Sequence, residues 1–144
     1  MELRRFNDGD IDECTTLFLS VFSKEPWNDQ WSSFDHAKTY LSEIVGSPGF
    51  LGFVAVEEDK IVGACLGRRK TWWSGPEYYI DEFFIDTGLQ GKGFGTKLIN
   101  HIKAAVLADG MRAIILLTDR GLPAARFYGK NGFFAQPQYD FYVL

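Results

Sequence analysis

The stretch that decides the fold reads Gln90-Gly91-Lys92-Gly93-Phe94-Gly95, and there a predicted strand passes into a predicted helix. The strand covers residues 78–85, a run rich in aromatic and β-branched side chains. The helix covers residues 96–108, where apolar side chains recur at helical spacing. Glycines at three of five positions allow a tight turn, and its exposed N–H groups at a helix start favour an anion. The sequence therefore predicts a phosphate-binding turn.

Two familiar phosphate-binding motifs do not fit this turn. A P-loop needs serine or threonine after its lysine, whereas Gly93 follows Lys92. A dinucleotide-binding G-x-G-x-x-G that begins at Gly91 would need glycine where Thr96 stands. The remaining pattern is Q-x-x-G-x-G, and a glycine-rich turn without any ligand stays open as the alternative.

Length and composition limit the class of protein. The chain has 144 residues, 46% of them apolar, which suffices for one domain with one core. A net charge of −4 argues against a nucleic-acid-binding surface. No apolar run has membrane-spanning length and no signal peptide opens the chain, so we expect a cytoplasmic protein without membrane contact. Cys14 and Cys65 lack metal or redox spacing, so we expect reduced core cysteines and no metal site.

The predicted elements follow the order β-α-α-β-β-β-α-β-α-β-β. The first helix, capped by Asn7 or Asp8, carries apolar residues from Ile11 to Phe22, and Ser32 or Ser33 caps the second. The remaining predicted ranges are, in turn, strands over 2–6, 50–56, 61–71 and 78–85, a helix over 96–108, a strand over 113–117, a helix over 123–130, and closing strands over 133–134 and 139–144. Residues 113–117 are continuously apolar, which predicts a buried strand.

Two segments in this order resemble a known family. The pattern at residues 90–95 resembles the acyl-CoA-binding motif [QR]-x-x-G-x-[GA] of the GNAT superfamily of N-acyltransferases. Residues 124–133 resemble the family's A-x-x-[FL]-Y-x-x-x-G-F signature, and the element order matches the family fold along nearly the whole chain. The resemblance implies one domain over residues 1–144 of the α/β (α+β) class. Its central sheet would be mixed and mostly antiparallel, with helices on both faces.

The resemblance also implies acetyl-CoA as the acetyl donor and assigns residues to it. The pyrophosphate would lie on the turn, against Gln90, Gly91, Lys92, Gly93, Phe94, Gly95 and Thr96. In the family the fourth and fifth strands splay apart and hold the pantetheine arm between them. The backbone of Phe83, Phe84 and Ile85 would take that role here. One departure is Gly121, where the family often has an asparagine that contacts this arm.

Attack by an amine on a thioester needs a group that accepts a proton and a group that donates one to the leaving thiolate. Asp81 and Glu82 stand inside the predicted strand, where carboxylates are rare, although an ion-paired or strand-end carboxylate is the alternative. Because neighbouring strand residues point to opposite faces, we expect at most one to face the acyl group. We favour Asp81, since I-D-x-[LF] resembles the acidic strand position of aminoglycoside acetyltransferases. Tyr128, at the signature position, is the candidate acid, with a core tyrosine as the alternative.

The acceptor would lie against the loop between the first two helices. Trp27 and Trp31, among acids and amides, suit a cationic and partly apolar amine, although ordinary packing is the alternative. We expect direct attack by a primary amine of a small molecule, with no cysteine near the acyl position. The alternatives are acetylation of a protein or peptide N-terminus or lysine, and a catalytically silent acyl-CoA-binding sensor. The closing strand over 139–144 would permit a homodimer without requiring one.

Overall fold

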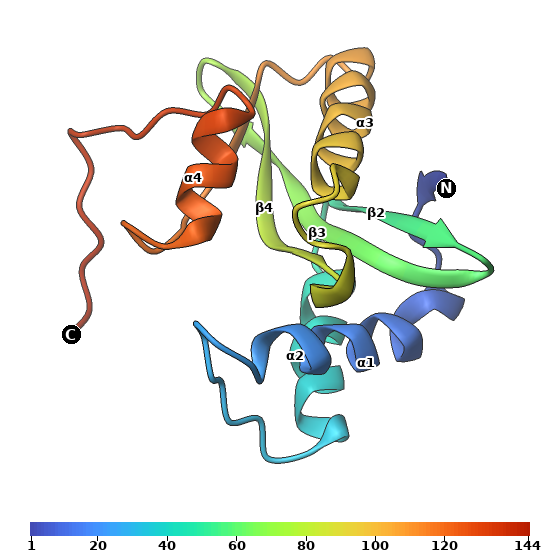
Figure 1. Cartoon of the computed structure of the whole chain (residues 1–144). Coiled ribbons are helices and arrows are strands. Elements are labelled where there is room, and N and C mark those ends of the chain that lie inside the picture. Colours follow the sequence, from blue (N-terminus) through green and yellow to red (C-terminus); the bar gives the residue numbers. More distant parts are fainter.

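The chain folds around one five-stranded sheet, which the computed structural model describes over residues 1–144 (Figure 1). The strands lie side by side in chain order: β1 (Glu2–Arg5), β2 (Phe50–Glu57), β3 (Lys60–Trp72), β4 (Gly75–Ile85) and β5 (Ala113–Leu116). Neighbours from β1 to β4 are antiparallel, and β4 pairs with β5 in parallel. The predicted mixed, mostly antiparallel sheet is confirmed.

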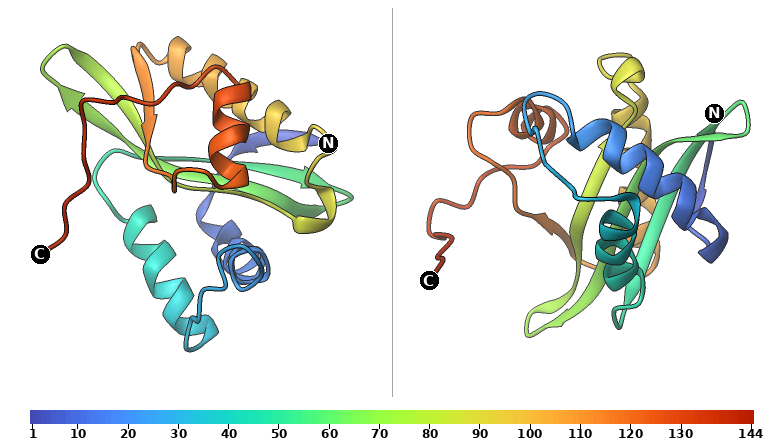
Figure 2. Two further views of the ribbon diagram at one scale, coloured as in Figure 1. Left: turned by 60° about the vertical axis from the view of Figure 1, so that its left-hand side comes forward. Right: turned by 90° about the horizontal axis from the view of Figure 1, so that it is seen from below.

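Helices cover both faces of this sheet (Figure 2). One face carries α1 (Ile11–Phe22) and α2 (Phe34–Val45), and the other carries α3 (Phe94–Ala108) and α4 (Pro123–Lys130). A single-turn helix η1 (Asp8–Asp10) precedes α1, and another, η2 (Thr87–Leu89), follows β4. None of the helices combines the length and apolar composition needed to cross a membrane.

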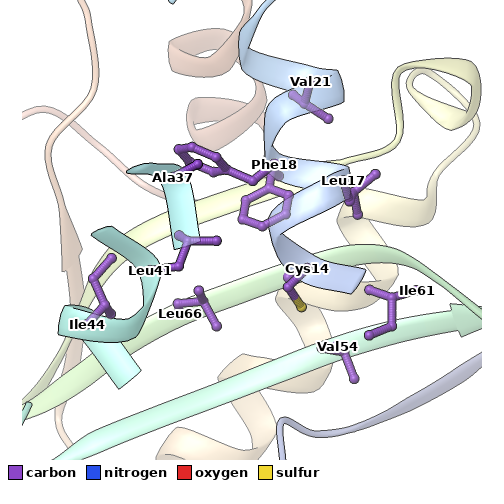
Figure 3. Close-up of a cluster of buried hydrophobic side chains, with 12 residues drawn as sticks. Cys14, Leu17, Phe18, Val21, Ala37, Leu41, Ile44, Val54, Ile61 and Leu66 are labelled. Atoms are coloured by element: carbon purple, nitrogen blue, oxygen red, sulfur yellow. The ribbon is translucent and has the colours of Figure 1, made fainter. Parts of the chain in front are cut away.

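The core on the α1 and α2 face is drawn in Figure 3. Its buried members come from both helices and from alternate strand positions: Cys14, Leu17, Phe18, Val21, Ala37, Leu41, Ile44, Val54, Ile61, Ala64, Leu66 and Phe84. On the helices they recur three or four residues apart, as amphipathic helices require. Burial of one large apolar side chain is worth about 1.5–3 kcal/mol, so this cluster holds α2 firmly against the sheet.

A second core lies between the sheet and α3. Its buried members are Phe53, Cys65, Tyr78, Ile80, Ile85, Leu98, Ile99, Ile102, Val106 and Met111. The neighbours Phe53 and Val54 belong to different clusters, as the alternation of a strand requires. Cys14 and Cys65, one in each cluster, are free and buried, so the prediction of core cysteines is confirmed.

Several predicted boundaries shift by one to three residues. Asn7 caps η1, where its side chain accepts a hydrogen bond from the Gly9 N–H, and the regular helix begins only at Ile11. Strand β4 begins three residues before the predicted start, at Gly75, because its ladder with β3 extends to the pair of Trp72 and Gly75. The second helix is capped by Ser33, one of the two serines predicted.

The C-terminal segment differs from the prediction. Residues 133–144 contain no strand, so the predicted closing strands over 133–134 and 139–144 are not formed. Figure 1 shows this segment running away from the sheet. Its aromatic residues favour a strand, but a strand also needs a ladder partner, and this segment has none. Strand β5 consequently forms the edge of the sheet and is half-buried rather than buried as predicted.

Candidate active site

The turn between β4 and α3 depends on its glycines. Gly91 and Gly93 have φ angles of 77° and 85°, the left-handed region that side chains disfavour. Gly95 is needed for a different reason, since a Cβ there would lie 3.0 Å from the ring of Phe127 on α4. The glycine pattern therefore fixes both the shape of the turn and the contact between two helices.

The same turn presents a row of unused N–H groups. The side chain of Gln90 donates to the carbonyl of Ile85 over 3.1 Å, which ties the turn to the end of β4. The first backbone hydrogen bond of α3 runs from Lys97 N–H to the Gly93 carbonyl, and the N–H groups of residues 91–96 donate to no protein acceptor. Lys92 is exposed beside them. Free N–H groups at a helix N-terminus suit a phosphate or pyrophosphate.

Strands β4 and β5 separate next to this turn. Their ladder ends at the pair of Ile80 and Leu116, whereas β4 continues along β3 to Ile85. The side chains of Phe84 and Ile85 are buried, and that of Phe83 stacks on Phe127 with ring centres 5.5 Å apart. Because the side chains are occupied, this part of β4 offers its backbone to the gap, as an extended amide-bearing ligand needs.

A β-bulge in β4 brings the two carboxylates to one face. Two successive residues of β3 pair with Glu82 and Ile80, so Asp81 is an extra residue without a partner. Ile80 packs toward α3, whereas Phe84 packs toward α1 and α2, although an unbroken strand would point both the same way. The prediction that Asp81 and Glu82 lie on opposite faces is therefore wrong, because the bulge interrupts the alternation.

Both carboxylates line a cavity of about 480 Å³. Its walls come from α1, the loop over 23–33, α2, β4, the end of β5 and the segment after it, α4 and the C-terminal segment. Four carboxyl groups and no lysine, arginine or histidine line it; the acids are Asp29, Asp81, Glu82 and Asp119. A concave site of this size with aromatic walls and converging acids suits a small cationic ligand.

Glu82 has a strongly perturbed acidity. Burial raises its pKa to about 7, against a hydrogen bond that lowers it, and the charges of Asp81 and Asp29 raise it further. That hydrogen bond comes from the hydroxyl of Tyr40 on α2, at 2.6 Å. Burial also raises the pKa of Asp81, while the charge of Arg68 on β3 lowers it. A carboxyl group that titrates near neutrality is suited to accept a proton there.

Helix α4 places Tyr128 on the wall of the same cavity. The ring packs edge-on against Phe83, Phe127 and Phe133, with centroid distances of 6.1, 5.4 and 5.5 Å. Burial raises its pKa above the ordinary phenol value, so the hydroxyl keeps its proton near neutral pH. Tyr128 thus packs against aromatic side chains, as expected of a core tyrosine, and it also lines the cavity.

Trp27 and Trp31 line the cavity too. Trp31 packs on Phe18 and Tyr40 with ring centres 5.4 and 5.3 Å apart, and Trp27 packs on Phe22 at 5.0 Å. Both are therefore anchored to the α1 and α2 core and are also available to a ligand.

Tyr40 lines the cavity and was missed by sequence reasoning as a site residue. Tyr40 lies three residues after the inward-facing Ala37, so helical spacing could have placed it inward, but nothing local pairs it with Glu82. Asp29 and Asp119 lie in loops, and only the folded chain brings them beside Asp81.

Gly121 occupies a turn before α4 with a φ angle of 82°. That conformation favours glycine, so the departure from the family's asparagine has a local structural reason. Thr118 and Asp119, just before it, line the cavity.

Cys65 pairs with Phe83 in the sheet, but its thiol lies in the core beneath α3, 3.6 Å from the hydroxyl of Tyr78, and does not line the cavity. It is fully buried, and burial raises its pKa to about 12, so it stays a neutral thiol and a poor nucleophile. Nowhere do three or more His, Cys, Asp or Glu side chains gather as metal ligands.

Comparison with known families adds to this geometry. The model of the acetyltransferase (GNAT) family matches residues 12–133, which include the bulge, the glycine turn and Tyr128. The chain belongs to the GNAT acetyltransferase family. Members of this family use acetyl-CoA. None of the curated proteins matches the chain in sequence.

Solved structures share the fold over almost the whole chain. An aminoglycoside acetyltransferase from an uncultured soil metagenomic sample, in complex with sisomicin, is 24% identical and covers 99% of this chain and 95% of its own, with a TM-score of 0.75. An integron cassette protein from V. cholerae is 20% identical, with a TM-score of 0.82; the match covers 99% of this chain and 91% of the cassette protein. The enzyme AAC(6')-Iy, in complex with a bisubstrate analogue of CoA and acetylneamine, is 15% identical, covers 99% and 97%, and has a TM-score of 0.75.

Proposed function

We propose that this protein transfers an acetyl group from acetyl-CoA to a primary amine of a small cationic molecule, by direct attack. The observation that carries the proposal is the cavity that four carboxyl groups and no basic side chain line. The gap between β4 and β5 and the free N–H groups of residues 91–96 supply a fitting place for the donor. The adjoining acidic cavity supplies a place for the acceptor.

The donor would lie along this gap. The N–H groups of residues 91–96 would bind the pyrophosphate, with the charge of Lys92 beside them. The open backbone of Phe83, Phe84 and Ile85 would pair with the amides of the pantetheine arm. One of these N–H groups would also stabilise the thioester oxygen as it becomes an oxyanion.

Chemistry at the junction needs two proton transfers. The amine nitrogen bonds to the acetyl carbonyl carbon, and the carbon–sulfur bond then breaks. Glu82 or Asp81 accepts the proton that the nitrogen loses, directly or through water. Tyr128 donates a proton to the departing thiolate, and its raised pKa keeps that proton on the hydroxyl until then.

The size of the cavity favours a small acceptor over a protein or peptide. Its volume of about 480 Å³ lies within the range of small-molecule sites. Trp27 and Trp31 offer ring faces to a cation. The similarity to an aminoglycoside acetyltransferase solved with sisomicin supports the same class, an amine with several positive charges.

The test has two stages. Acetyl-CoA should raise the melting temperature of the protein, and a rise with NAD or ATP in its place would refute the donor assignment. A panel of small polyamines, aminoglycosides and lysine-containing peptides is then assayed for release of free CoA thiol. Release with the small cations supports the proposal, and release with peptides alone would assign protein acetylation. Binding of acetyl-CoA without release by any amine would indicate a silent sensor.

A further inference from the structure

We infer that Tyr40 is a positioning residue, whose hydroxyl holds Glu82, rather than Asp81, as the carboxylate that takes the proton of the attacking amine. The inference rests on the proposed acetyl transfer and adds to it a residue from the opposite wall of the acceptor cavity.

The contact between the two side chains is short and rigid. The hydroxyl of Tyr40 donates to Oε1 of Glu82 at 2.6 Å. The ring of Tyr40 packs on Trp31 and Phe18, with centroid distances of 5.3 and 5.9 Å. Because α2 is anchored by its own buried core, the donor is already in place before any ligand arrives.

The bulge gives the two carboxylates different partners. Glu82 accepts the hydrogen bond of Tyr40 and lines the cavity with Phe18 and Phe22, and no lysine, arginine or histidine lines that cavity. Asp81 is the unpaired residue of the bulge; burial raises its pKa, and the nearby charge of Arg68 opposes that rise. Asp81 accepts no such hydrogen bond and is available to attract a further ammonium group of the acceptor, whereas Glu82, with a pKa of about 7, can cycle between its two protonation states near neutrality.

Protons balance with this assignment. As the carbon–nitrogen bond forms, the nitrogen proton passes to the second oxygen of the Glu82 carboxylate or to a water beside it. Tyr40 keeps its own proton throughout, because burial and the charge of Glu82 raise its pKa far above neutrality. Its hydrogen bond stabilises the charged form of Glu82 and so lowers the pKa of that carboxyl group.

The titratable and charged groups that face Glu82 come from every neighbouring element. They are Tyr40 on α2, Asp81 on β4, Arg68 on β3 behind Asp81, Asp29 in the loop over 23–33, Asp119 after β5 and Tyr128 on α4. The charges of Asp81 and Asp29 raise the pKa of Glu82, as burial does. Tyr40 is the group whose hydrogen bond opposes them.

The experiment compares Tyr40→Phe with the wild type across pH. The ratio of their kcat/KM values is plotted from pH 5.5 to 9.5, so that the titration of the acceptor amine itself cancels. The fall of kcat/KM at low pH, the acid limb of the profile, reports the pKa of Glu82. Loss of the hydrogen bond should move this limb to higher pH by about one unit. The variant should therefore lose about tenfold at pH 6 and less than about twofold at pH 9.

Four further variants make the result specific. Tyr79 lies on the same face of β4, and its hydroxyl makes no hydrogen bond to Glu82. Tyr79→Phe should therefore leave the acid limb of the pH profile in place. Glu82→Gln should abolish the limb, whereas Asp81→Asn should keep it. Tyr40→Phe combined with Glu82→Gln should be no slower than Glu82→Gln alone, since Tyr40 acts through Glu82.

A readout independent of turnover separates this inference from the proposed function. Carbon-13 NMR of the Glu82 carboxyl group should give a higher pKa in Tyr40→Phe than in the wild type. The inference is overturned if the wild type acetylates amines but Tyr40→Phe moves neither the acid limb nor the pKa of the Glu82 carboxyl group. It is also overturned if Asp81→Asn loses the acid limb. If no amine is acetylated, the proposed function fails, and the carboxyl titration still decides the contact between Tyr40 and Glu82.

Discussion

Tyr128 illustrates how one side chain can serve packing and chemistry together. One face of its ring lies against Phe83 and Phe133, and the residue also lines the acceptor cavity. Burial raises its pKa, so a departing thiolate would meet a protonated phenol near neutral pH. The packing fixes the ring, and the fixed ring keeps the hydroxyl in one place.

Replacing Tyr128 by phenylalanine keeps this packing and removes the proton. We expect kcat to fall by about a hundredfold, within the range for loss of a general acid, while the affinity for acetyl-CoA changes less than about twofold. Steady-state kinetics and calorimetric titration measure the two quantities. Tyr142→Phe, in the exposed C-terminal segment, is the matched control and should change neither. Parallel losses of turnover and affinity would assign Tyr128 a structural role.

At the scale of elements, the glycine turn and the bulge shape the site most. The turn was predicted because its signal is local, namely glycine where φ must be positive, followed by a helix. The bulge was not predicted, because an extra residue in β4 can be recognised only from its register with β3. One inserted residue thus decides that Asp81 and Glu82 share a cavity.

Alanine at Gly91 tests the turn. A left-handed φ of 77° costs a side chain about 1–2 kcal/mol, so the variant should either lose stability or change the turn. We expect its dissociation constant for acetyl-CoA to rise roughly five- to tenfold as the N–H groups lose their alignment. Gly110→Ala is the control, since its φ is 78° and no atom crowds its Cβ, yet it lies at the far end of α3. Equal weakening in both variants would show that strain alone matters.

At the scale of the whole molecule, the acceptor cavity exists only because distant segments converge. Trp31, Tyr40, Glu82 and Tyr128 come from the interhelical loop, α2, β4 and α4. Four carboxyl groups and no basic side chain line this cavity, so acidic groups are concentrated there. A negative potential in a concave, partly apolar site attracts cations over several ångströms and is screened by salt.

This field predicts how a cationic acceptor responds to salt and charge. The KM of a polyamine acceptor should rise several-fold between 50 and 500 mM salt, because screening weakens the attraction, as the Debye length falls below about 10 Å. Asp29→Asn should raise that KM about three- to tenfold at low salt with kcat within about twofold. Asp35→Asn, on the exposed start of α2 outside the cavity, is the control and should leave KM unchanged. A KM independent of salt and of Asp29 would contradict a cationic acceptor.

The sequence by itself determined the features whose cause is local. Helical periodicity, strand composition and helix capping gave α1 to α4 and β1 to β5 within a few residues. Glycine chemistry gave the turn at Gly91 and Gly93, and the resemblance of residues 124–133 singled out Tyr128. Each depends on a few neighbouring residues and on the conformations open to them.

Tertiary structure alone decided the rest. The shared face of Asp81 and Glu82 depends on the register of β4 against β3, and the bond from Tyr40 joins residues 42 positions apart. The C-terminal segment is a case in which local composition predicted too much. Its alternating aromatic residues favour a strand, but a strand forms only beside a partner, and the segment has none. Pairing and convergence are properties of distant segments, and no window of sequence contains them.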